Sequence, residues 1–244
     1  MDFWNDNKEN GVVIHIRSKA GTAFFHQHFI KTFFKYTGIR PSAAWQSYYM
    51  FKENHEFHDD DWSHITDVVS DVNFNHNHII HIRDFRDMLC SDYGGSLSDP
   101  HGPYEGNKKV IMDQCSSISE FAVFKERPSV WGHGYSFDFF KNIMCKEFDS
   151  LVTYMNKNNN VKIVYYEDMV TDFWKYLCDM NMLLKIDIGQ LINIYNDLKD
   201  SFVPDGIHKR YVVPQEYKKR LTPELSMEFS EIYKQYDFLH RYIN

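Results

Sequence analysis

A lysine, a glycine and a threonine follow directly on a short apolar run, where they could hold a phosphate group. Residues 12–17 (VVIHIR) have the composition of a strand, and Lys19, Gly21 and Thr22 lie in the turn after it. A glycine lets backbone N–H groups approach a ligand closely, and the helix expected over residues 20–36 offers unpaired N–H donors and a positive dipole end. With a single glycine, preceded by the lysine, the turn is not the GxxxxGK[ST] loop of nucleoside triphosphatases. A solvated lysine at a helix start is the alternative interpretation.

An arginine and a serine after a second apolar run could bind another phosphate. Residues 78–83 (HIIHIR) predict a strand that ends at Arg83, and Ser91 lies in the helix expected over residues 84–93. A guanidinium can bind a phosphate through two parallel hydrogen bonds, and a hydroxyl from the helix adds a further donor. The alternative is an Arg83–Asp87 salt bridge at the surface, beside a serine that faces solvent.

The elements that must position these side chains alternate between strands and helices. Strands are expected over residues 12–17, 44–51, 78–83 and 161–166, with helical patterns between and after them. This alternation predicts an α/β fold with a central, mostly parallel sheet flanked by helices, and no linker divides residues 1–244 into more than a single domain. Ligands of such sheets gather at the carboxyl ends of the strands, which is where both phosphate candidates lie.

The composition narrows the classes of function. A net charge of −7 argues against broad binding to nucleic acids or anionic membranes, because both need a basic field. No stretch approaches the roughly 20 apolar residues of a membrane span, and the polar start of the chain has no signal-peptide core. Four scattered cysteines without a CxxC pair indicate reduced thiols, so we expect a cytoplasmic protein.

Taken together, the two phosphate candidates resemble the sulfotransferase superfamily. Members of this family transfer a sulfuryl group from 3′-phosphoadenosine 5′-phosphosulfate (PAPS) and release adenosine 3′,5′-bisphosphate (PAP). The family reads K-[SA]-G-[TS] after its first strand and R-[ND]-P-x-D-x-x-x-S-x-Y after a later one. This chain has KAGT at residues 19–22 and RDFRDMLCSDY at residues 83–93.

Two further segments follow the family's order. Y-E-D-M at residues 166–169 is similar to the family's Y-E-D-[LM] motif. Near the C-terminus, the family reads R-x-G-x-x-G-x-W-K and then L-T-P-E; the matching positions here are Arg210, Tyr217, Lys218 and residues 221–224. Both glycines of that region are absent from this chain. The resemblance therefore spans most of the sequence and implies the P-loop-NTPase-like architecture of sulfotransferases.

The resemblance implies how the chain would hold PAPS. Lys19 would contact the 5′-phosphate and the oxygen that bridges it to sulfur, and so stabilise the leaving group. Phe24 would stack on the adenine in place of a family tryptophan, and Tyr166 would lie near the same base. The loop residues that would hold the 5′-phosphate are Ala20, Gly21, Thr22 and Ala23. The residues that would bind the 3′-phosphate are Arg83, Ser91 and Arg210. No metal is expected, because the transferred group carries less charge than a phosphoryl group.

The sequence says less about the residues that would bind and deprotonate the sulfate acceptor. The family places its general base after the second strand, where this chain has Glu53, His55 and His58. We prefer His55, because imidazole titrates near neutral pH, and place Glu53 second. Trp131 and His133 fall where family members line the acceptor pocket. The acceptor itself is not indicated beyond a small molecule or a sugar, and neither is the oligomeric state.

Departures from the family pattern leave room for different functions. Phe85 replaces the usual proline, and Ala23 replaces a common hydroxyl residue of the first loop. His55, His58 and Asp59 form an HxxHD pattern that could belong to a metal-dependent phosphohydrolase. The phosphate-binding candidates could also belong to a divergent nucleoside or nucleotide kinase, or to a domain that kept the fold without the chemistry.

Overall fold

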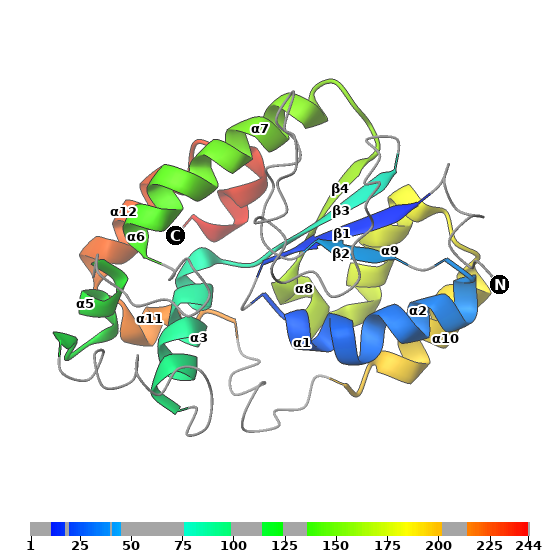
Figure 1. The fold of residues 1–244 in the computed structure, drawn as a ribbon, viewed down its shortest axis with the longest axis horizontal. Coiled ribbons are helices and arrows are strands. Elements are labelled where there is room, and N and C mark those ends of the chain that lie inside the picture. Colours follow the sequence, from blue (N-terminus) through cyan, green and yellow to red (C-terminus); the bar gives the residue numbers. More distant parts are fainter. Residues whose placement is uncertain are drawn as a thin grey trace, which may run out of the picture. The chain divides into compact units, whose positions relative to one another are not determined.

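The chain forms two compact units in a computed structural model that describes residues 11–17, 20–39, 41–44, 76–98, 114–123, 136–201 and 214–243. Unit 1 comprises Met1–Ile82 and Asp149–Val203, and unit 2 comprises Arg83–Phe148 and Pro204–Asn244. Unit 1 holds the sheet and unit 2 is helical in its described residues (Figure 1). The single domain expected from the sequence stays a prediction.

The sheet of unit 1 is fully parallel, with the strand order β2-β1-β3-β4. Its strands are β1 (Val12–Ile16), β2 (Ser42–Ala44), β3 (Asn77–Ile82) and β4 (Val161–Tyr165). Three of the predicted strands are confirmed to within one residue. The prediction over residues 44–51 overlaps β2 only at Ala44, and the rest of that range lies outside the described residues. Buried Val and Ile on β1 and β3 explain why these two strands occupy the middle of the sheet.

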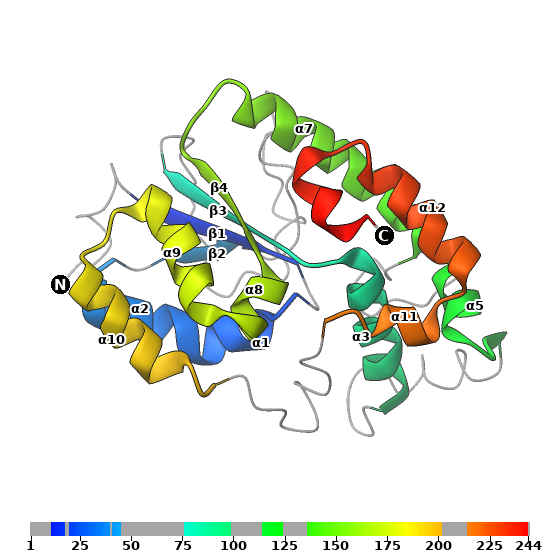
Figure 2. The same ribbon diagram turned by 180° about the vertical axis from the view of Figure 1, so that it is seen from behind.

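The helix after β1 continues over residues 22–37 and includes a π-helical stretch. Its parts are α1 (Thr22–Phe24), the π-helical residues Phe25–Phe29 and α2 (Ile30–Thr37). Phe25, Phe29 and Phe33 are all buried, so the aromatic period seen in the sequence does mark the core face. The other helices of unit 1 are α8 (Tyr166–Thr171), α9 (Phe173–Leu184) and α10 (Ile188–Leu198), and α9 crosses the sheet on the side shown in Figure 2.

The two faces of the sheet bury different histidines. His78 lies 3.1 Å from His15 between ring nitrogens, and its ring also contacts Tyr154. His81 contacts Tyr176 of α9 instead, with 2.8 Å between Nδ1 and the hydroxyl oxygen. Their odd spacing on β3 puts His78 and His81 on opposite faces, as expected from the sequence.

Unit 2 is built around an aromatic core. The Phe85 ring packs 4.6 Å from that of Phe140, and both lie within 6 Å of Phe229. The elements here are α3 (Phe85–Ser98), α5 (Ile118–Val123), α6 (Phe137–Phe139), the π-helical residues Phe140–Met144, α7 (Cys145–Met155), α11 (Tyr217–Arg220), α12 (Pro223–Tyr233) and the 3-10 helix Asp237–Tyr242; α7 continues into unit 1.

Two helix predictions needed correction. The pattern over residues 109–125 predicts one helix, but residues 115–117 are not helical, because Ser117 caps a new helix by accepting from the Glu120 N–H group at 3.2 Å. The helix expected over residues 84–93 continues through Ser98. In the part of the chain that the structure describes, no helix combines the length and the apolar character that a membrane crossing requires.

Candidate functional site

Three of the four sequence motifs leave the sheet at the same edge. Ile16 of β1 is in register with His81 of β3, and Ile82 is in register with Tyr165 of β4. The K-A-G-T loop, Arg83 and the Y-E-D-M segment therefore begin at neighbouring strand ends. The strand order reverses at β1, because β2 pairs on one side of it and β3 on the other. Such a switch point is where open α/β sheets bind ligands.

Gly21 adopts a backbone that requires glycine. Its φ of 91° is left-handed, and it directly precedes α1, so it shapes the entry to the helix. The Ala20 N–H group donates to the carbonyl oxygen of Arg17 at 3.1 Å, which closes the turn after β1. The first N–H groups of a helix have no acceptor within the helix, so a turn of this kind can bind an anion.

The Y-E-D-M segment packs against this turn. A Cβ atom at Gly21 would lie 3.0 Å from Cε of Met169 and 3.2 Å from two ring carbons of Tyr166. Both side chains are buried, and the Tyr166 ring also meets His81 edge-on at 6.2 Å. The first and third motifs thus form one packed unit around a glycine that leaves no room for a side chain.

A buried carboxylate holds α8 in place. Asp168 accepts from Nζ of Lys175 at 2.7 Å, and the same nitrogen donates to Asp179 at 2.8 Å. These hydrogen bonds raise the pKa of Lys175, the one that Asp168 accepts having the larger effect. Asp172 separates α8 from α9 and caps α9 through the Lys175 N–H group at 3.0 Å. Lys175 is a residue that sequence reasoning missed, although the capping aspartate before it was readable.

Phe24 lies in the aromatic core of unit 1. It is 3% exposed, and its ring meets those of Phe25, Phe29 and Phe173 at 5.5 to 6.0 Å. A stacked adenine needs a free ring face, which a side chain this buried does not offer. The burial therefore does not favour the stacking role predicted for Phe24, and that role stays a prediction.

In unit 2, Arg83 lies just before α3 and Ser91 lies on it. Arg83 is 7% exposed and Ser91 is half-buried. Asp87, midway between them, is 1% exposed, so a salt bridge at the surface does not describe this region. Burial, followed by the charge of Asp84, raises the pKa of Asp87, although Arg83 opposes that shift.

Arg86 ties α3 to the C-terminal part of unit 2. It is fully buried, and its Nη2 donates to Asp84 at 2.7 Å and to the Tyr242 carbonyl oxygen at 2.6 Å. Its guanidinium lies 3.8 Å from the ring centroid of Tyr217, and Tyr233 donates to Asp84 at 2.9 Å. Asp84 lies two positions before Arg86, but Tyr217 and Tyr242 come from the far end of the chain, so no local pattern indicates the role of Arg86.

A solved structure covers nearly the whole of this arrangement. The crystal structure of mouse sulfotransferase SULT7A1 complexed with PAP matches 96% of this chain and 88% of its own, with a TM-score of 0.55 and 12% identical residues. The chain has a sulfotransferase fold. The family resemblance of the motifs is thereby confirmed at the level of the fold, including the parallel sheet flanked by helices. No protein-family model matches the sequence, and no curated protein sequence does either.

Several predicted residues of the sulfotransferase fold lie outside the described residues. They are Lys19, Glu53, His55, Trp131, His133 and Arg210, together with His58 and Asp59 of the phosphohydrolase alternative. The backbone of Ala23 lies in α1, but its side chain is not described. Among the described residues, no group of three or more His, Cys, Asp or Glu side chains could hold a metal ion.

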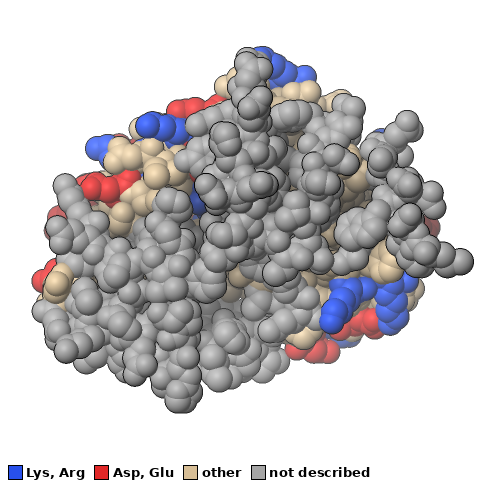
Figure 3. All heavy atoms as spheres, viewed as in Figure 1, with Lys and Arg blue, Asp and Glu red and all other residues tan. Residues whose placement is uncertain are grey.

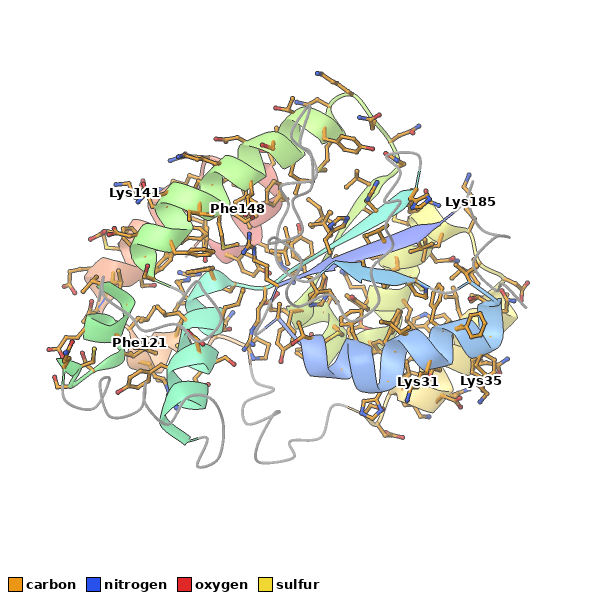
Figure 4. All side chains as sticks on the ribbon, in the orientation of Figure 1. Lys31, Lys35, Phe121, Lys141, Phe148 and Lys185 are labelled. Atoms are coloured by element: carbon orange, nitrogen blue, oxygen red, sulfur yellow. The ribbon has the colours of Figure 1, made fainter. Side chains whose placement is uncertain are left out.

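The exposed cations of α2 in this sulfotransferase fold belong to a mixed surface. Lys31 and Lys35 project from α2 on the outer side of the helix (Figure 4). Lys35 pairs with Asp197 at 2.9 Å, and the described part of the face in Figure 3 carries both basic and acidic side chains. A mixed surface of this kind is ordinary solvation and points to no polyanion.

Proposed function

We propose that the protein is a sulfotransferase that moves the sulfuryl group of PAPS to a hydroxyl or amine of a small molecule or sugar, and releases PAP. One observation carries the proposal: Gly21 of the first loop is packed beneath Tyr166 and Met169 at strand ends that are in register with the end of β3. The loop, the arginine and the tyrosine of the family motifs thus start from one edge of the sheet.

The donor roles follow from the chemistry of each group. N–H groups at the start of the helix after Gly21, together with Thr22 and Lys19, would bind the 5′-phosphate. Arg83 and Ser91, with Arg210, would bind the 3′-phosphate, the arginine through two parallel hydrogen bonds. Tyr166 would lie near the adenine; its position next to Gly21, and not its burial, supports this role.

The transfer itself needs a base and a stabilised leaving group. His55, or Glu53, would take the proton of the acceptor as its oxygen or nitrogen bonds to sulfur. The bond from sulfur to the bridging oxygen breaks, and its electron pair stays on the 5′-phosphate. Lys19 and the helix N-terminus would stabilise that charge, so most of the catalysis is positioning and electrostatics.

Calorimetric titration with PAP, with AMP and ATP as controls and without added metal, tests the proposal. We expect micromolar or tighter binding of PAP, about −8 kcal/mol, and clearly weaker binding of AMP. Arg83→Ala should bring the PAP affinity down to that for AMP, whereas Lys141→Ala, which removes an exposed lysine of unit 2, should not.

Two results would contradict the proposal. Equal affinity of the wild-type protein for PAP and AMP would leave no 3′-phosphate site. Binding of ATP only when magnesium is present would favour the kinase alternative. If the protein bound PAP as expected, a screen of phenols, amines and sugars with PAPS would then identify the acceptor.

A further inference from the structure

Asp87 binds the backbone of a turn that lies far along the chain. Its Oδ2 accepts from the Gln215 N–H group at 2.6 Å, and its Oδ1 accepts from the Tyr217 N–H group at 3.1 Å. Gln215 is left-handed with a φ of 69°, whereas Glu216 is right-handed with a φ of −62°. Alternation of this kind makes successive N–H groups converge on an anion, and the anion here is the Asp87 carboxylate.

Gln215 is an unusual residue for this conformation. A side chain disfavours left-handed backbone because its Cβ atom crowds the carbonyl oxygen, so glycine is the usual choice. Counted back from Tyr217 and Lys218, Gln215 occupies the second glycine position of the R-x-G-x-x-G-x-W-K pattern. Gln215 thus adopts a backbone conformation that usually requires glycine, and the turn is held by two N–H groups that donate to the buried Asp87 carboxylate.

The turn is fastened beside the predicted ligands of the 3′-phosphate. Asp87 precedes Ser91 by four positions, so these two residues share one side of α3, and Arg83 lies just before the helix begins. Arg83 is close enough to Asp87 for its charge to lower the pKa of that carboxyl group, against the larger effect of burial. Arg86, on the preceding position of α3, holds the Tyr217 ring from another direction.

We propose that Asp87 is a positioning residue of the donor site, which holds the turn of residues 214–217 in place and thereby keeps Arg83 and Ser91 arranged for the 3′-phosphate. This inference rests on the proposed function. Because the Asp87 carboxylate already occupies the two converging N–H groups, these donors are not the phosphate ligands. Without the carboxylate, Gln215 leaves its left-handed conformation and the turn moves away from α3.

The test compares Asp87→Ala with the double variant Asp87→Ala/Gln215→Gly. We expect Asp87→Ala to weaken PAP binding about tenfold or more, which is about 1.4 kcal/mol, with little change for AMP. Glycine adopts the left-handed turn unaided, so the double variant should recover most of the PAP preference. Glu231→Ala, which removes an exposed carboxylate of α12, should keep the wild-type ratio of PAP to AMP affinity.

The ratio of PAP affinity to AMP affinity distinguishes a positioning role of Asp87 from a role in stability alone. A purely structural Asp87 would lower the unfolding midpoint and leave the PAP-to-AMP ratio of the folded protein unchanged, which would overturn the inference. So would a double variant no better than Asp87→Ala. If Asp87→Ala does not fold, Asp87→Asn replaces it: its one remaining acceptor should give an intermediate loss that Gln215→Gly also repairs. A wild-type protein with no PAP preference would instead refute the proposed function, and this role with it.

Discussion

At the scale of single residues, two left-handed positions shape the turns beside the predicted phosphate ligands. Gly21 has a φ of 91° and Gln215 has a φ of 69°. The first was readable as a glycine between a strand and a helix. The second was hidden, because the sequence has glutamine there and the carboxylate that compensates for it is Asp87, more than a hundred positions away.

Gly21→Ala should disrupt both the fold and the donor site. The added methyl group costs about 1–2 kcal/mol in the left-handed conformation and also meets Met169 at 3.0 Å. Gly38 is the matched control, since its φ is 70° and a Cβ atom there has no neighbour within 4 Å. In urea unfolding and PAP titration, we expect Gly21→Ala to lose more stability and more PAP affinity than Gly38→Ala. Equal losses would mean that the Tyr166–Met169 packing is irrelevant to the loop.

Lys19→Ala should impair turnover far more than binding. If Lys19 stabilises charge that develops on the leaving phosphate, its loss should cut kcat about 100-fold or more, as removal of a transition-state donor does. The affinity for PAP should fall less than about tenfold. Lys31→Ala, an exposed lysine on α2, is the control. Losses confined to PAP affinity, with kcat unchanged in single-turnover transfer to a screened acceptor, would assign Lys19 to binding alone.

Sequence reasoning pointed to the motif residues but not to the residues that hold the neighbouring turns in place. Gly21 and Arg83 were singled out because their residue types and strand-end positions indicate phosphate binding, and Tyr166 because its segment resembles the family's Y-E-D-[LM] motif. Asp87 was considered only as a salt-bridge partner of Arg83, and Arg86 was not singled out. Their roles depend on Gln215, Tyr217 and Tyr242, and contacts over such sequence distances leave no periodic pattern in a single sequence.

At the scale of elements, strands were predicted better than helix breaks. Val and Ile runs predicted β1, β3 and β4, because buried parallel strands are continuously apolar. The break between α8 and α9 at Asp172 and the new helix after Ser117 were missed, although both residues are N-caps. No residue pattern in the sequence indicates the π-helical stretches at Phe25–Phe29 and Phe140–Met144.

The buried histidine pair of β1 and β3 should make the free energy of unfolding depend on pH. His15 is buried beside His78, and burial first, then that neighbour, holds the pKa of His15 well below its ordinary 6.5. In the unfolded chain His15 gains a proton as the pH falls below that value, while in the folded protein it does not. Acid therefore favours unfolding, and the stability that neutral His15 provides is present above the unfolded pKa.

His15→Gln should remove this dependence. Between about pH 7.5 and about pH 5.5, we expect the wild-type protein to lose about 1.4 kcal/mol more of its free energy of unfolding than the variant does. Urea midpoints at the two pH values measure the difference. His240→Gln, which removes a half-exposed imidazole of unit 2, should keep the wild-type slope. If the His15→Gln slope matched the wild-type slope, His15 would be protonated to the same extent in both states.

At the scale of the whole molecule, neither unit is a continuous piece of chain. The chain passes between the units after Ile82, after Phe148 and after Val203. The sequence, without a linker, predicts one domain, and the three crossings explain why no boundary could be read from composition. The two segments of each unit are joined by a segment of the other unit. Bringing them together to form a core therefore costs the entropy of closing that connecting loop.

The two units should therefore unfold together. Phe29 of unit 1 and Phe140 of unit 2 are equally buried, at 0% and 1% exposure, so Phe29→Leu and Phe140→Leu are matched lesions in the two cores. Each should cost about 1–2 kcal/mol and shift one common transition. Hydrogen exchange followed by mass spectrometry reads both units at once, and either variant should lower protection in peptides from both. If each variant affected only peptides of its own unit, the units would be independent domains. Donor binding would then stabilise only those peptides whose residues contact PAP.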